Sequence, residues 1–163
     1  MTVMIRKIKP QKEWPFFEAY HDSTYIIRHD CSQEIPLKER GEKSTYRLRN
    51  FSRKEIVAYK IDDGIICDKN VPKCDYGVYI EDDVLYLVEL KGAELEHALK
   101  QIFSTIDILL IQPRIRVKCL NVRITLSKVS IPKIESKNEH KLKQLLHKTF
   151  GGGDYRKQSK ELI

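Results

Sequence analysis

The sequence predicts an α/β domain in which a mixed central β-sheet is flanked by helices. The order of hydrophobic patterns from residue 55 onward is β-β-β-α-β-α. The strand predicted over residues 84–91 is apolar on both faces, which indicates a central strand covered by helices on both sides. A long amphipathic helix follows it, and 163 residues are enough for one domain with its own core.

The first fifty residues are predicted to form an accessory region. Residues 14–20 suit a short helix with Pro15 in its first turn, and residues 24–28 have the composition of a strand. Residues 35–50 carry five basic side chains and few apolar ones, so a solvated loop is favoured over a phosphate-binding patch.

The first two core strands are predicted at residues 56–61 and 73–80. Asp63-Gly64 suits a hairpin turn, after which residues 65–67 resume the strand. Residues 52–55 also fit a capping box that would open a short helix instead.

The third strand follows a turn at Asp82-Asp83 and covers residues 84–91. Because side chains alternate along a strand, Glu89 and Lys91 are expected on the same face as Leu85 and Leu87. The chain then enters a helix near Ala93 that ends before Pro113. Its buried stripe is predicted to consist of Leu95, Ala98, Leu99, Ile102, Ile106 and Leu109.

A further strand over residues 116–126 and a final helix over residues 140–150 complete the predicted domain. We therefore predict a single domain over residues 1–150, with its core at about 52–127. Residues 151–163 are glycine-rich and then polar, so a flexible tail is expected.

Composition restricts the function classes. Lys and Arg number 30 against 23 for Asp and Glu, and the net charge of +7 suits either solubility or a polyanionic partner. The four dispersed cysteines lack CxxC spacing, which argues against zinc and thioredoxin-type sites and for free thiols inside the cell. Without an apolar leader or a bilayer-length apolar run, we expect a cytoplasmic protein without membrane contact.

Three ionisable residues interrupt otherwise apolar strands: Asp75, Glu89 and Lys91. The Glu-x-Lys pattern occurs three times, at Glu89, Glu135 and Glu139, but only the first ends a strand that is apolar on both faces. An ordinary ion pair at a strand end is one interpretation. Asp75 in the preceding strand and Gln101 on the following helix favour a site that binds a divalent cation and activates water.

The run CDYGVYI…VLYLVELKGAELEHALKQI, within residues 56–110, resembles the core of the PD-(D/E)XK nuclease superfamily. The resemblance implies a restriction-endonuclease-like fold with a mixed four-stranded sheet flanked by helices. The family aspartate then falls on Asp75, its acidic residue on Glu89 and its lysine on Lys91, and the glutamine that recurs in several branches would be Gln101. Cys74 stands where the motif name has proline.

This resemblance implies a Mg²⁺-dependent nuclease that hydrolyses phosphodiester bonds, with DNA as the expected substrate. Asp75 and Glu89 would hold Mg²⁺, or Mn²⁺ in its place, together with the backbone carbonyl of Leu90. Lys91 would orient the attacking water or stabilise transition-state charge, and Gln101 would position the phosphate or the water. Endonuclease and exonuclease activities both remain open.

An upstream acid often joins such a site, and Glu55, Glu34 and Glu18 are the candidates, with Glu55 nearest and equally suited to be a helix cap. Many members of the superfamily are dimers, which leaves a homodimer open. The alternative function is a catalytically inactive module on the same fold that binds nucleic acid or a protein.

Overall fold

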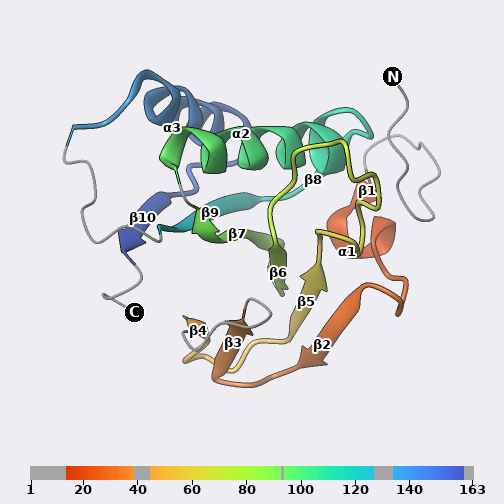
Figure 1. The fold of residues 1–163 in the computed structure, drawn as a ribbon. Helices are drawn as coiled ribbons and strands as arrows, with labels where there is room; N and C mark the ends of the chain where they lie inside the picture. Colours follow the sequence, from red (N-terminus) through yellow and green to blue (C-terminus); the bar gives the residue numbers. More distant parts are fainter. Residues whose placement is uncertain (1–13, 39–44, 93, 127–133, 160–163) are drawn as a thin grey trace.

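The molecule is organised around a six-stranded mixed sheet (Figure 1). The computed structural model describes residues 14–38, 45–92, 94–126 and 134–159, with the backbone alone at Trp14, Lys91, Gly92 and Ser159. The strand order is β10-β9-β7-β6-β5-β2. The strands are β2 (Ile26–Asp30), β5 (Ile56–Lys60), β6 (Tyr76–Ile80), β7 (Val84–Gly92), β9 (Cys119–Leu126) and β10 (Tyr155–Ser159).

Pairing within the sheet explains why it is mixed. Strands β2, β5, β6 and β7 are antiparallel neighbours, whereas β9 and β10 continue from β7 in parallel. The crossover from β7 to β9 passes through a helix, as a parallel connection requires. The predicted α/β class with a mixed central sheet is therefore confirmed, and β2 and β10 extend the sheet beyond the predicted core.

Helices cover one face of the sheet, which lies beneath them in Figure 1. They are α1 (Phe16–Ala19), α2 (Leu95–Ile106) with its π-helical continuation η1 (Asp107–Ile111), and α3 (Lys137–Thr149). Leu85 and Leu87 of β7 pack there with Leu99, Ile102 and Ile106 in one buried cluster. The predicted stripe of α2 and the predicted final helix are confirmed.

The opposite face is covered by a β-hairpin, which corrects two predictions. Strands β3 (Glu34–Lys38) and β4 (Thr45–Arg49) pair in antiparallel fashion over the segment predicted to be a solvated loop. Ile35, Leu37, Tyr46 and Leu48 are buried against this face, and the basic side chains between them point outward. Alternation of apolar with charged residues was the sequence signal of a half-buried hairpin. Because this hairpin covers the second face, helices flank the sheet on one side only.

The segment after β5 is a turn and loop, not the predicted hairpin. Residues 65–67 form no strand, and β5 pairs with β2 and β6 instead. The amides of Ile65 and Ile66 donate to the carbonyls of Lys60 and Ile61, both at 3.0 Å. Both isoleucine side chains are fully buried, so they contribute to the core rather than to strand pairing.

Replacing Gly64 with alanine is expected to lower the free energy of unfolding by about 1–3 kcal/mol, the usual cost of overpacking. A Cβ atom at this position would lie 1.9 Å from the carbonyl oxygen of Lys60, a backbone atom that cannot swing aside. Urea denaturation measures the change. Gly152→Ala is the control, since the nearest atom to its added Cβ is 4.0 Å away, although its positive φ of 86° carries some strain. Equal stability of Gly64→Ala and the unsubstituted protein would contradict the prediction.

The predicted flexible tail contains the edge strand β10. Tyr155 to Ser159 pair in parallel with Val122 to Leu126 of β9, which corrects that prediction as far as Ser159. A small parallel pair, β1 (Trp14–Pro15) with β8 (Ile115–Arg116), lies outside the main sheet. Across the described ranges, no helix has the length and apolar character needed to cross a membrane.

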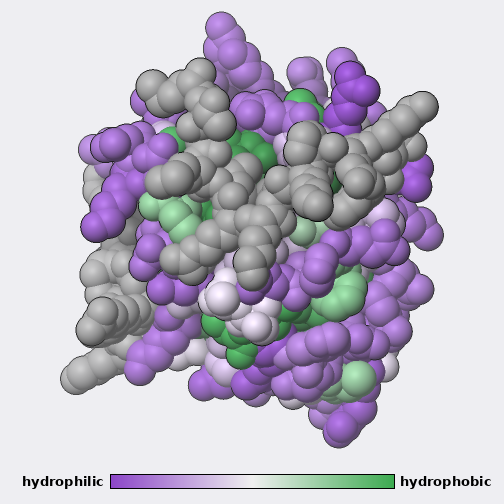
Figure 2. Space-filling model, turned by 90° about the vertical axis from the view of Figure 1, so that its right-hand side faces the viewer, coloured by the Kyte–Doolittle hydropathy of each residue, from purple (hydrophilic) through white to green (hydrophobic). Residues whose placement is uncertain are grey.

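On the face shown in Figure 2, most of the coloured residues are hydrophilic, and hydrophobic residues are visible between them. Over the described residues, the large apolar side chains that are most exposed are scattered: Ile27, Phe51, Ile111 and Ile134.

Candidate active site

The candidate site lies where β6 begins and β7 ends. In the antiparallel register, Tyr76 pairs with Val88. One residue further along the same register, Asp75 stands opposite Glu89. Directly opposed residues project from the same face of a sheet, with Cβ atoms about 5 Å apart. Two carboxylates that are distant in sequence therefore lie side by side where β6 begins and β7 ends, on the helix-covered face of the sheet.

A hydrogen bond fixes Asp75 against the end of β7. The backbone N–H of Leu90 donates to Oδ2 of Asp75 over 2.8 Å. The backbone carbonyl of Asp75 accepts from the N–H of Ile61 at 3.0 Å, which ties the same residue to the end of β5. Asp75 is thus held from both neighbouring strands.

Glu89 is a charged residue inside the fold, with 5% of its surface exposed. Burying a carboxylate is costly unless a cation or hydrogen-bond donors compensate for lost water. The neighbouring Cys74 is completely buried. Burial raises the pKa of its thiol, and the negative charges of Glu89 and Asp75 raise it further. Both carboxylates therefore act electrostatically on the same small region.

Helix α2 is anchored to the segment that precedes Asp75. The N–H of Cys74 donates to Oγ1 of Thr105 at 2.9 Å, and Nε2 of Gln101 donates to the carbonyl of Lys73 at 3.2 Å. The Thr105 hydroxyl donates in turn to the Gln101 carbonyl at 2.8 Å. Oε1 of Gln101 is buried and accepts no hydrogen bond from the described residues. Gln101 thus lies beside the site, as its position after β7 predicts.

Thr105 was not anticipated from the sequence. The available signal was a polar residue one turn after Gln101, within the apolar stripe of α2. A threonine hydroxyl on a buried helix face needs a partner, and here that partner is the backbone beside Asp75.

Leu90 and Lys91 complete the predicted set. The side chain of Leu90 packs into the hairpin-side core, so its contribution to the site comes from its backbone. Lys91 belongs to β7, but its side chain lies outside the described part of the structure. The pairing of β7 with β9 shifts register between Glu89 and Gly92. The roles of the Leu90 carbonyl and of Lys91 stay predictions.

Glu55 lies away from this pair. It immediately precedes β5, whose first residue, Ile56, pairs with Ile80, whereas Asp75 adjoins the opposite end of β6. Five strand residues span about 16 Å. The Glu55 carboxylate is 2.5 Å from Nε2 of His29 on β2.

The other two upstream candidates also have other surroundings. Glu34 forms ion pairs with Arg47 and Arg49 on the β3–β4 hairpin. Glu18 lines a pocket with Glu55. The structure therefore brings together Asp75, Glu89 and Gln101 but none of the three upstream acids.

The two carboxylates of the site offer only hard oxygen donors. Over the described ranges, no group of three or more His, Cys, Asp and Glu side chains is placed to hold a metal ion. The two opposed carboxylates are a smaller set, and Mg²⁺ sites in proteins often use one or two carboxylates with several water ligands. Neither Asp75 nor Glu89 lines any of three pockets of about 490, 480 and 320 Å³. The pair lies at the ends of two central strands, outside those pockets.

No family model, curated protein or solved structure matches this chain.

Proposed function

We propose that this protein is a Mg²⁺-dependent nuclease that hydrolyses phosphodiester bonds, with DNA as its substrate. The observation that carries the proposal is the juxtaposition of Asp75 and Glu89, with the Leu90 N–H held by Asp75 over 2.8 Å. A buried glutamate beside a second carboxylate is unfavourable in an apolar core. A cation bound between the two carboxylates would offset the charge of both.

The order of elements around the pair supports the same proposal. Strands β5, β6 and β7 form an antiparallel meander, α2 follows, and β9 returns parallel to β7. This order agrees with the restriction-endonuclease-like core that the sequence resemblance implies. Asp75 borders the second strand of the meander and Glu89 lies in the third, as the family motif requires.

Each side chain of the candidate site would have its own role in phosphodiester hydrolysis. Asp75 and Glu89 would hold Mg²⁺, which when bound supplies Lewis acidity and lowers the pKa of bound water. Lys91 would orient that water or offset negative charge as it develops on the phosphate. Gln101 would maintain the position of the Lys73–Asp75 segment through its bond to the Lys73 carbonyl.

Charge and thiol state are consistent with this substrate. A net charge of +7 favours a polyanion. The four cysteines are free thiols, which suits the cytoplasmic location we propose. A homodimer would allow two sites to cut two strands.

Cleavage assays test the proposal. The substrates are supercoiled, linear, single-stranded and branched DNA, with RNA alongside, in Mg²⁺, Mn²⁺ or EDTA. We expect cleavage with either metal and none with EDTA. Asp75→Ala and Lys91→Ala should each abolish it, whereas the matched control Lys137→Ala should not, because Lys137 is exposed and belongs to the separate match Glu135-Ser136-Lys137.

Two results would reject the nuclease. Cleavage that survives both Asp75→Ala and Lys91→Ala would show that the activity arises elsewhere. DNA binding without cleavage of any substrate would favour the inactive nucleic-acid-binding module, whose affinity should fall steeply with salt. A partner affinity that is insensitive to salt would favour a protein-interaction module.

A further inference from the structure

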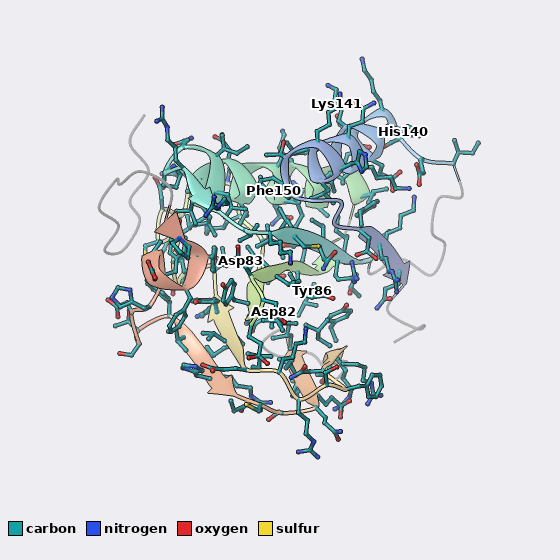
Figure 3. All side chains as sticks on the ribbon, turned by 180° about the vertical axis from the view of Figure 1, so that it is seen from behind. Asp82, Asp83, Tyr86, His140, Lys141 and Phe150 are labelled. Carbon is teal, nitrogen blue, oxygen red and sulfur yellow. The ribbon has the colours of Figure 1, made fainter. Side chains whose placement is uncertain are left out.

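A second feature of the molecule lies at the far end of the sheet from the candidate active site. Glu89 pairs with Ile124, whereas the start of β7, Val84, pairs with Cys119 at the start of β9. Just before Cys119 the chain borders a pocket of about 490 Å³, within the size range of ligand sites. Most of its lining is apolar: Leu110, Ile111, Ile115, Val117 and Phe150. Figure 3 shows Phe150 where α3 ends.

The wall of this pocket, which we call the η1 pocket, is built from irregular backbone. The helix continues past Ile106 as the π-helix η1, closed by a bond from the Gln112 N–H to the Asp107 carbonyl at 2.9 Å. The Tyr20 hydroxyl donates to the Leu109 carbonyl at 2.6 Å and supports this turn. Such single π turns occur frequently at functional sites because they redirect side chains.

Two residues at the mouth of the pocket are energetically unusual. Ile111 is 46% exposed although it is a large aliphatic side chain. Arg114 has a φ of 56°, a left-handed conformation that is unfavourable for a residue with a Cβ atom. A partner that covered Ile111 would remove this apolar side chain from water, and Arg114 lies beside it in the lining of the pocket.

The charge at the mouth is of one sign. Arg114 and Arg116 both line the pocket, and no aspartate or glutamate is among the described residues that line it. Guanidinium groups bind carboxylates through paired hydrogen bonds with fixed geometry. An apolar floor beside two arginines is therefore complementary to a ligand that combines apolar groups with carboxylates.

We propose that the η1 pocket docks a segment of a partner protein in which large apolar side chains stand next to aspartate or glutamate. The apolar side chains would fill the floor and cover Ile111, and a carboxylate would bind Arg114. A nucleic-acid backbone fits less well, because it presents phosphates evenly and would leave the apolar floor unfilled. This inference is independent of the proposed nuclease activity.

A selection with random dodecapeptides displayed on phage, against the immobilised full chain, tests the proposal. Enriched peptides should combine Asp or Glu with Leu, Ile, Phe or Trp. A synthetic peptide of that kind should bind the unsubstituted protein in fluorescence anisotropy. Arg114→Glu, Arg114→Gln and Ile111→Asp should each weaken it by about tenfold or more.

The matched control is Lys141→Glu, which makes the same change of charge at an exposed position on α3. In Figure 3, Lys141 lies toward the other end of α3 from Phe150, so this variant should bind the peptide normally. Thermal unfolding establishes that all four variants fold.

The proposal is overturned by no enrichment, by enriched peptides without acidic residues, or by equal binding of the Arg114 variants and the unsubstituted protein. Competition for the pocket by a single-stranded oligonucleotide, lost in Arg114→Gln, would also overturn it and identify a nucleic-acid surface instead.

Discussion

Replacing Glu89 with glutamine is expected to reduce metal-dependent DNA cleavage at least about a hundredfold. Loss of a residue that merely supports a metal ligand costs 10–100-fold in many metalloenzymes, and loss of a ligand should cost at least the upper end. Glutamine keeps the shape of the side chain but removes the charge that a cation requires. Initial rates of cleavage of a single DNA substrate at saturating Mg²⁺ measure the loss.

The same substitution should leave the fold intact. Glu89 is 5% exposed, and glutamine keeps the volume of its side chain and its capacity to accept a hydrogen bond. Addition of Mg²⁺ should raise the melting temperature of the unsubstituted protein by mass action and should not affect Glu89→Gln. This separates loss of a metal site from loss of structure.

Glu135→Gln is the matched control, because Glu135 opens an equivalent Glu-x-Lys match but pairs with Lys143, whose side chain is 45% exposed. It should cleave normally. Unchanged cleavage by Glu89→Gln, or an equal loss in Glu135→Gln, would contradict the assignment of Glu89 as a metal ligand.

Replacing Glu139 with alanine is expected to lower the free energy of unfolding by about 3–5 kcal/mol, the cost of breaking a buried ion pair from one side. The Glu139 side chain is fully buried at the start of α3. Its carboxylate accepts from the Tyr155 hydroxyl and from the Ser136 N–H, both at 2.7 Å, and lies 2.7 Å from Nζ of Lys157. Alanine would leave these donors buried without their acceptor.

Urea denaturation measures the loss, and hydrogen exchange of the β10 amides locates it, since Tyr155 and Lys157 belong to that edge strand. Glu135→Ala is the control, and loss of its partly exposed ion pairs should cost about 1 kcal/mol or less. Equal stabilities of the two variants would show that Glu139 does not hold β10 in place.

The loss of folding stability at low pH should also depend on Glu139. Burial of Glu139 favours its neutral form, but the Lys157 ammonium, the Ser136 amide and the Tyr155 hydroxyl outweigh burial and lower its pKa. Since this pKa is below that of the unfolded chain, the stabilisation is present above the unfolded value and is lost as pH falls through the folded one. Glu139→Gln should therefore lose less stability on acidification than the unsubstituted protein.

Local hydrophobic patterns in the sequence were sufficient to predict the central strand of the fold and the helix that follows it. The apolar run of β7 predicted a buried central strand, and strict alternation placed Glu89 on the face of Leu85 and Leu87. The helical spacing of apolar residues after Gly92 predicted α2. These signals work because burial on a strand or helix repeats with the period of that element.

The hairpin β3–β4 could not be predicted from such local patterns. Ile35, Leu37, Tyr46 and Leu48 alternate with polar or charged residues, but each run is short and basic, so composition favoured a solvated loop. These strands are stabilised by burying their apolar side chains against the sheet face that no helix covers. Most residues of that face follow the hairpin in the chain. The same holds for Ile65 and Ile66, whose burial depends on core contacts rather than on the turn before them.

By itself, the sequence determined the α/β class, the central strand and its helix, and the identity of Asp75, Glu89 and Gln101 as candidates. Tertiary structure alone decided that Asp75 stands opposite Glu89 in register, that Thr105 anchors the backbone beside them and that Glu55 lies too far away. It also decided that a polar tail becomes β10, through pairing with β9 and with the buried Glu139. The physical reason is that periodicity reports burial along one element, whereas register, coverage and charge pairing depend on residues that only folding brings together.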